Sequence, residues 1–350
     1  ALSTRLDPRR RLDDGMFVLR HVGQGYPPVR RAQKVISALT FGEREFRRSS
    51  VSCHEICRTF GEMLGLETSV QRALGQMHER WDGRGAPAQL KGEDKALAAR
   101  IAHFAGDIDI FYRLGGADAA TMVARQRSGK AYDPRIAQLF CREATHLCSQ
   151  LDVEPIWETV LAAEPAPWRW LNEAGLDGFC QAMAHFADVK SPYTVGHSTG
   201  VATLAEAAAR ASGLPEADVA AVRRAGFLHD LGRIGVPVGI WDKPEPLTQA
   251  EWERVRVHPY LTERILARSA VLGRLGALAS LHHERLDGSG YHRGVTESFI
   301  QPAARILAAA DFFHTKTEPR PPRAALLPKA VAASAYSEAQ AGRLDRQAVS

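Results

Sequence analysis

Seven side chains in the second half of the chain are of the types that bind transition metals. They are His197, His229, Asp230, His258, His282, His283 and Asp311. Imidazole and carboxylate donors without a thiolate suit iron, manganese, nickel or zinc that also binds water, whereas closed structural zinc sites commonly use cysteine. Because Asp230 directly follows a histidine and four further histidines accompany it, the set predicts two neighbouring metals that share one carboxylate.

Helical segments are expected to carry these residues into a bundle. A helix is predicted to begin near His197, because helix breakers precede this residue and strong helix formers follow it. Gly213 suits the left-handed position that ends such a helix. The next helix is predicted to begin near Pro215 and to place His229 and Asp230 at its end. Since adjacent helical residues diverge by about 100°, Asp230 can face a second metal or bridge both metals.

The remaining candidate ligands also lie at the ends of segments. Thr248 and Glu251 have the spacing of a capping box, which starts a helix that runs toward His258. The pair at 282–283 is expected to end the following helix, ahead of a glycine-rich loop. Asp311 ends an apolar stretch, where a buried carboxylate is costly unless it is paired or bound to metal.

The composition is typical of a globular protein with reduced thiols. The chain has 350 residues, of which 45% are hydrophobic, and its Ala- and Leu-rich segments predict an all-α fold. Five widely spread cysteines favour a cytoplasmic protein over a disulfide framework. No apolar run approaches the roughly 20 residues that span a bilayer, so no membrane insertion is expected. The net charge of +5 fits a phosphate-bearing substrate, but it equally fits an arginine-rich protein without such a ligand.

A repeated motif indicates that the chain contains two related domains. The segment HERWDGRGAP at 78–87 matches HERLDGSGYH at 283–292 in six of ten positions. The same offset of 205 aligns 98–101 with 303–306 without a gap. Such ordered self-similarity predicts a tandem duplication. The expected organisation is a degenerate domain at 1–150, a linker at 151–175 and a metal-binding domain at 176–350.

The first copy lacks most of the candidate ligands. At the offset of 205, the positions of His258, His282 and Asp311 are taken by Cys53, Met77 and Gly106. Only His78 keeps its counterpart, which is His283. We therefore expect a metal-free first domain with a structural or dimerising role, the latter in a homodimer.

Several motifs of the second half occur in a fixed order. They are KSPYTVGHS at 190–198, HDLGRIG at 229–235, HP at 258–259, HHERLDGSGY at 282–291, ILAAAD at 306–311 and TEPRPPR at 317–323. This series resembles the HD-GYP subfamily of HD-domain metal-dependent phosphohydrolases. The resemblance implies an all-helical bundle with two or three metal ions, commonly iron or manganese, bound by the seven side chains above. It also implies hydrolysis of cyclic di-GMP or a related cyclic dinucleotide.

The same resemblance assigns roles to individual residues. Asp230 is implied as the metal bridge and as a catalytic residue together with Arg233. A metal pair suits phosphodiester cleavage because it lowers the pKa of a bound water and neutralises charge on the phosphoryl oxygens. The residues expected to contact substrate phosphate or guanine are Arg285, Asp287, Gly288, Gly290 and Tyr291.

Four positions depart from the pattern of that subfamily. Arg233 stands in place of lysine, and a planar guanidinium makes different contacts from a compact ammonium. His292 replaces the proline of the GYP tripeptide and is expected either to face solvent or to reshape the substrate loop. Tyr193 stands where three-metal members have glutamate, which favours two metals. His314 replaces an acidic residue and is expected to be solvated or to support a ligand.

Other functions fit the same residues. A sensor that binds metal or nucleotide without turnover would explain Arg233, His292 and the decayed first copy. An HD enzyme that acts on other phosphoesters is a further alternative. Similar tandem arrangements are often followed by a helix-turn-helix domain, and nothing within 1–350 resembles a recognition helix. DNA binding is therefore expected only through a domain beyond Ser350.

Overall fold

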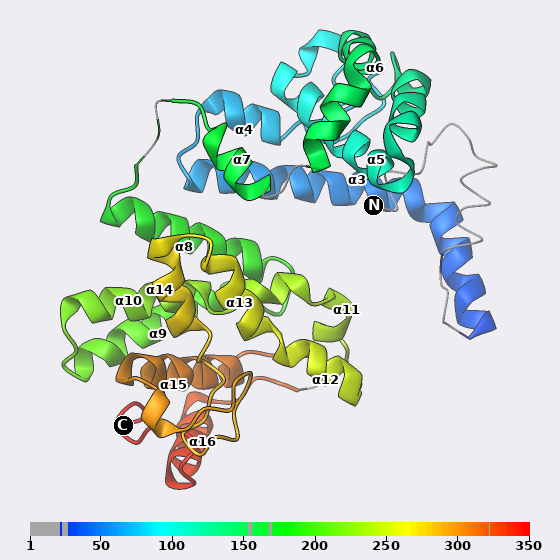
Figure 1. Cartoon of the computed structure of the whole chain (residues 1–350). Helices are drawn as coiled ribbons and strands as arrows, with labels where there is room; N and C mark the ends of the chain where they lie inside the picture. The colour runs from blue at the N-terminus through cyan, green and yellow to red at the C-terminus, as the bar shows by residue number, and fades with distance from the viewer. Residues whose placement is uncertain (1–21, 23–26, 153–155, 167, 169, 322) are drawn as a thin grey trace. The chain divides into compact units, whose positions relative to one another are not determined.

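The computed structural model describes residues 22, 27–152, 156–166, 168, 170–321 and 323–350, without the side chains of 34 and 37–53. Among these residues, helices are joined by turns and isolated β-bridges, and no β-strand is present. The predicted all-α fold is confirmed. The chain divides into two compact units, Ala1–Trp170 and Leu171–Ser350 (Figure 1).

The first unit is built around two long helices. Its helices are α3 (Pro28–Met63), α4 (Thr68–Leu74), α5 (Leu97–Arg127), α6 (Pro134–Ser149) and α7 (Ile156–Ala162), with 3₁₀ turns η1 (Gly92–Asp94) and η2 (Gln150–Asp152). Helices α5 and α6 enclose a core in which the ring of Phe104 packs edge-on against Tyr132 and Phe140, at 5.1 and 5.4 Å between centroids. Helix α7 lies within 151–175, a segment that the sequence predicts as a linker.

The second unit is a bundle of shorter helices. They are α8 (Glu173–Asp188), α9 (His197–Ala211), α10 (Glu216–Leu228), α11 (Val238–Trp241), α12 (Gln249–Arg256), α13 (His258–Leu266), α14 (Ala270–Ala279), α15 (Pro302–Thr317) and α16 (Pro328–Gln340), with 3₁₀ turns η3 (Leu231–Gly235) and η4 (Glu297–Phe299). Helices α9, α10, α14 and α15 share one core, which is rich in alanine. Small side chains at these positions let the helix axes approach closely.

Several predicted helix boundaries are confirmed. Helix α9 begins at His197, and Gly213 follows its end with a φ of +71°. Pro215 precedes α10 directly. Thr248 and Glu251 form the predicted capping box, with the side chain of each bonded to the backbone N–H of the other.

Other boundaries differ from the prediction. His258 does not continue α12 but begins α13, because the chain turns at Val257 and Pro259 is tolerated in a first helical turn. Asp311, for which no helix end is predicted, lies inside α15, which continues to Thr317. The pair at 282–283 follows α14 in a turn, rather than ending the helix itself.

A similar set of contacts closes a loop in each unit. The carboxylate of Glu79 accepts hydrogen bonds from backbone N–H groups nine and eleven residues later, at 2.6 and 3.1 Å. Glu284 accepts the corresponding two bonds at 2.7 and 3.1 Å. The β-bridges are Asp82 with Lys91 and Asp287 with Thr296. Arginine then pairs with aspartate in both units, as Arg100 with Asp133 and Arg305 with Asp345.

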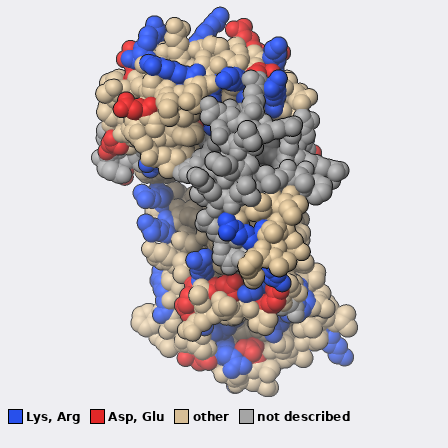
Figure 2. Space-filling view, turned by 90° about the vertical axis from the view of Figure 1, so that its right-hand side faces the viewer, with Lys and Arg blue, Asp and Glu red and all other residues tan. Residues whose placement is uncertain are grey.

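On the face drawn in Figure 2, basic and acidic side chains are interspersed. The net charge of +5 therefore gives no broad basic surface on this face. Among the described residues, no helix combines the length and the apolar character needed to cross a bilayer.

The close approach of α9 and α10 gives a first prediction. Gly226→Ala is expected to lower the free energy of unfolding by about 1–3 kcal/mol through overpacking, because the added Cβ would lie 2.6 Å from the Cα of Ala202. Urea unfolding followed by circular dichroism measures the change. Gly178→Ala on α8 is the matched control, since its Cβ meets nothing within 4 Å. The control should gain about 0.5–1 kcal/mol from helix propensity, and equal losses in both variants would contradict the close approach.

Candidate metal centre

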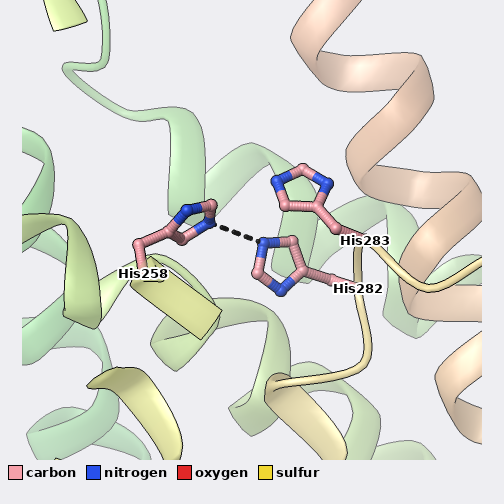
Figure 3. A group of neighbouring side chains, drawn as sticks. All are labelled: His258, His282 and His283. Carbon is pink, nitrogen blue, oxygen red and sulfur yellow. Dashed lines mark hydrogen bonds between the residues drawn. The ribbon is translucent and has the colours of Figure 1, made fainter. Parts of the chain in front are cut away.

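The structure brings the seven predicted ligands together in the second unit. Six of them are buried, and only His283 is partly exposed. Their ligand atoms fall into two main groups, and within each group all atoms lie within 4.8 Å of one another. The first group is His197, His229 and Asp311, and the second is His258, His282 and His283. Figure 3 shows the second group, in which Nε2 of His258 lies 3.2 Å from Nε2 of His282.

Asp230 lies between the two groups. Its Oδ2 is 3.6 Å from Nε2 of both His197 and His229. Its Oδ1 is 3.4 Å from Nε2 of His258 and 3.8 Å from Nε2 of His282. One carboxylate oxygen therefore faces each group, which is the arrangement that a bridging ligand requires.

Three histidines are oriented by the same backbone contact. Nδ1 of His229, His258 and His282 lies 2.7, 2.6 and 2.7 Å from the carbonyl oxygen three residues earlier. A carbonyl can only accept a hydrogen bond, so Nδ1 carries the proton in each ring. The lone pair is then on Nε2, which points into the cluster and is available to a metal.

The donor set fits bound divalent metal ions. Nε2 of His229 is completely buried and has no hydrogen-bond partner, a costly state for a polar atom unless something binds it. Two ligand atoms that each lie about 2.1 Å from one ion are roughly 3.0–4.2 Å apart. The separations of 3.4 Å between His197 and Asp311 and 3.8 Å between His229 and Asp311 fall in this range.

Burial keeps His282 and His283 neutral. It lowers the pKa of His282 to about 3. Burial and the neighbouring His282 also hold the pKa of His283 well below its usual value. Neutral imidazole is the form that binds metals, so these side chains are ready to ligate at neutral pH.

The two aspartates remain ionised although they are buried. Burial alone would raise the pKa of Asp230, but the charge of Arg233 holds it well below its usual range. Burial likewise opposes ionisation of Asp311, and the hydrogen bond with His197 outweighs it, so the pKa of Asp311 is also far below normal. Burial lowers the pKa of His197, but its bonds to Asp311 and Glu318 raise it overall to about 9.

Contacts that sequence reasoning missed hold the ligand-bearing segments in place. The hydroxyl of Thr262 accepts from the N–H of Gly232 at 2.9 Å and donates to the carbonyl of His229 at 2.8 Å. A Cβ at Gly232 would lie 2.0 Å from the carbonyl oxygen of His258, so the absence of a side chain there lets η3 approach α13. Thr262 and Gly232 thus fix His229 relative to His258.

The loop that carries Arg233 is anchored by a lysine. Nζ of Lys190 donates to the carbonyl oxygens of Arg233, Ile234 and Val236 at 2.9, 2.7 and 2.6 Å. The guanidinium of Arg233 donates to Oδ2 of Asp230 at 2.7 Å and stacks 4.0 Å from the ring centroid of Trp241. Arg233 is therefore held beside the cluster by its ion pair with Asp230 and by stacking on Trp241.

The five residues predicted to contact substrate lie in different surroundings. The ring of Tyr291 lies beside the cluster, 4.7 Å from the ring of His283. Asp287 accepts hydrogen bonds from Ser289, and a Cβ at Gly290 would lie 2.4 Å from the backbone of Arg285. Gly288, in the same loop, has a left-handed φ of +81°. The guanidinium of Arg285 lies 6.0 Å from the ring centroid of Phe312.

Two of the departures also have defined surroundings. The expectation that His292 faces solvent is wrong, because its loop folds against α13: the ring lies 5.8 Å from Tyr260, and the side chain is only 17% exposed. His314 lies beside a ligand, with Nδ1 3.2 Å from Nδ1 of His197. Glu318, which sequence reasoning did not single out, lies 2.9 Å from the same Nδ1.

The first unit buries a lysine beside a histidine. Nζ of Lys95 is buried and donates to the carbonyl of Glu79 at 2.6 Å, with Nδ1 of His103 at 3.1 Å. The side chain of Cys53 lies outside the described residues. All four groups of candidate metal ligands found in the described part of the chain belong to the second unit.

Comparisons with known proteins find similarity to an HD domain within the second unit. The family model described as HD domain matches residues 181–348. The chain is 37% identical over 266 residues to a 3′3′-cGAMP-specific phosphodiesterase of Vibrio cholerae, covering 75% of this chain and 58% of that protein. It is 41% identical over 127 residues to a cyclic di-GMP phosphodiesterase of Thermotoga maritima, covering 36% of this chain and 34% of that protein.

A solved structure agrees with these matches. The crystal structure of a cyclic GMP-AMP-specific phosphodiesterase from V. cholerae aligns with a TM-score of 0.62 and 28% identity, over 96% of this chain and 78% of that chain. The predicted HD-domain fold is therefore confirmed. The chain spans less than two thirds of the length of the two curated relatives, 58% and 34% respectively.

The double role of Thr262 gives a second prediction. Thr262→Val keeps the shape of the side chain but leaves the N–H of Gly232 and the carbonyl of His229 without partners. The free energy of unfolding of the metal-free protein should fall by about 2–4 kcal/mol, as measured by urea unfolding. Thr203→Val on the exposed face of α9 is the control and should change stability by less than about 0.5 kcal/mol. A loss as small as the control's would show that the Thr262 hydroxyl does not secure η3.

Proposed function

We propose that this chain is a metal-dependent phosphodiesterase that hydrolyses cyclic dinucleotides. The premise is that residues 181–348, which match the HD domain, form such a domain. The observation that carries the proposal is the geometry of Asp230, which turns one carboxylate oxygen to each of two ligand groups. Two metal ions held this way, when bound, supply an acidified water and neutralise charge on a phosphodiester.

The proposed metal ligands divide between two positions. His197, His229 and Asp311 serve one, His258, His282 and His283 serve the other, and Asp230 serves both. Imidazole and carboxylate donors without thiolate suit iron or manganese. Three of the imidazoles are already fixed with Nε2 toward the cluster, so little reorganisation accompanies binding.

Arg233 is the proposed catalytic partner of Asp230. Its guanidinium has several donors in one plane, so it can keep its bond to Asp230 and donate to a phosphoryl oxygen as well. Stacking on Trp241 fixes the plane of the guanidinium, and Lys190 fixes the backbone beneath it. These contacts give arginine a defined position where the related subfamily has lysine.

Substrate contacts are proposed around Tyr291. Its ring borders His283, and the guanidinium of Arg256 lies 5.9 Å from its centroid, so an aromatic face and a cation flank the metal positions. Such groups suit a guanine base and its phosphate. Arg285, Asp287, Gly288 and Gly290 shape the loop that presents Tyr291 and complete the proposed substrate set.

The substrate is proposed to be a 3′3′-linked cyclic dinucleotide. The relative that covers 75% of this chain is named for 3′3′-cGAMP, and another is named for cyclic di-GMP. Both molecules present two phosphodiesters within one ring and at least one guanine. We therefore propose 3′3′-cGAMP as the first substrate to test, with cyclic di-GMP beside it.

The first unit is proposed to be a decayed copy of the HD domain. Support comes from the loop contacts that recur with the same spacing, including those of Glu79 and Glu284. Support also comes from the arginine–aspartate pairs Arg100–Asp133 and Arg305–Asp345. Without the ligands, this unit is left with a structural or dimerising role.

A third prediction tests the function directly. The chain loaded with iron or manganese under reducing conditions should bind two ions and convert the cyclic dinucleotide to a linear product, as measured by elemental analysis and chromatography. His229→Ala and Asp230→Ala should abolish metal loading and product formation, because each removes a buried donor of the cluster. His78→Ala, a histidine change in the first unit, should leave both unchanged.

Two results would contradict parts of this proposal. A wild-type chain that binds no transition metal after loading would rule out the metal-dependent reaction. Tight binding of the dinucleotide with metal present and no product would instead identify a sensor module without turnover.

A further inference from the structure

His197 differs from the other oriented histidines of the cluster. His229, His258 and His282 each use a carbonyl oxygen three residues earlier to hold Nδ1. The carbonyl three residues before His197 belongs to Thr194, and it accepts the backbone N–H of His197 at 2.9 Å instead. His197 begins α9, and the start of a helix exposes N–H groups rather than carbonyls. Its ring therefore needs an acceptor from elsewhere in the fold.

Glu318 supplies that acceptor. Its Oε2 lies 2.9 Å from Nδ1 of His197, across 121 residues of sequence. It directly follows α15, the helix that also carries Asp311. The carboxylate is itself held on both sides: Arg320 donates to Oε2 at 2.9 Å, and Nδ1 of His314 lies 3.4 Å from Oε1.

We propose that Glu318 is a positioning residue that orients His197 and strengthens it as a metal ligand, an inference that rests on the proposed function. A carboxylate that accepts Nδ1–H fixes the ring and its tautomer, so Nε2 points at the metal position near Asp230 and Asp311. The negative charge also raises the electron density on Nε2, which a backbone carbonyl does less strongly. Glu318 thereby acts on one of the two metal positions only.

His314 is a weaker competitor for the same proton. Its Nδ1 lies 3.2 Å from Nδ1 of His197, but an ionised carboxylate at 2.9 Å is the better acceptor. With its own Nδ1 protonated, His314 donates to Glu318 and supports the arrangement. Gly200 makes room for this ring, since a Cβ there would lie 1.8 Å from Nε2 of His314.

A further cation bound by His197, His314 and Glu318 is the competing explanation, because their ligand atoms also lie within 4.8 Å of one another. Arg320 argues against it. The guanidinium already donates to the Glu318 carboxylate, and a second cation on the same oxygens would be repelled.

The test measures Mn²⁺ binding to the metal-free chain of residues 1–350, by equilibrium dialysis with elemental analysis. The wild-type chain should bind two equivalents. In Glu318→Ala, one equivalent should bind about 10–100-fold more weakly, as is typical when a partner of a ligating histidine is lost, and the other should be unchanged. The affinity of Glu318→Gln for this equivalent should lie between those of the wild type and Glu318→Ala. The amide oxygen of glutamine still accepts Nδ1–H but carries no charge.

Controls separate this role from general destabilisation. Glu338→Gln removes a glutamate of the same unit that is paired with Arg343 away from the cluster, and it should bind both ions as the wild type does. Thermal unfolding of the metal-free variants should show that Glu318→Gln and Glu338→Gln remain folded. The Gln variant keeps the test informative even if Glu318→Ala does not fold.

Each other outcome overturns the inference in a recognisable way. Unchanged affinities in both Glu318 variants would show that His197 needs no carboxylate. Equal weakening at both positions would indicate a general structural role, and a third equivalent that disappears in Glu318→Ala would make Glu318 a direct ligand. No binding by the wild-type chain would instead overturn the proposed function, and this inference with it.

Discussion

The second unit depends on one electrostatic constraint: two ionised aspartates and several imidazoles are buried together. Asp230 and Asp311 have almost no contact with solvent, and their charges are stabilised by neighbouring histidines and, at Asp230, by Arg233. An unpaired buried charge would be far more costly than the whole stability of a domain allows. The alanine-rich core of α9, α10, α14 and α15 lets the helices approach closely enough to meet this constraint.

Carbonyl groups near helix ends orient three of the histidine rings. The last carbonyls of a helix have no partner within the helix, and three ligands use them: His229 at the end of α10, His258 after α12 and His282 after α14. Each bond uses a carbonyl near a helix end and turns Nε2 toward the cluster. His197 lies at a helix start, where no such carbonyl exists, and a carboxylate takes its place. The positions of ligands near helix boundaries thus have a physical cause.

The two units share one loop geometry, and only the second unit places this loop beside a cluster of candidate metal ligands found among the described residues. Glu79 and Glu284 close their loops by accepting hydrogen bonds from backbone N–H groups at corresponding positions. Gly83 and Gly288 both adopt a left-handed φ. These contacts depend on the backbone and on one buried carboxylate, so they tolerate changes at neighbouring positions. Metal ligation depends on several donors at once, and no such set is found among the described residues of the first unit.

The sequence by itself determined the helical class, the seven clustered side chains and local signals such as the Thr248 capping box, because these depend on residue type and short spacing. Only the tertiary structure decided which groups meet. The contacts of Glu318 with His197 and of Lys190 with the η3 carbonyls join residues 121 and 43–46 positions apart. Glutamate and lysine are common at surfaces, so their types gave no signal. Such contacts arise from the packing of whole helices, which local patterns do not specify.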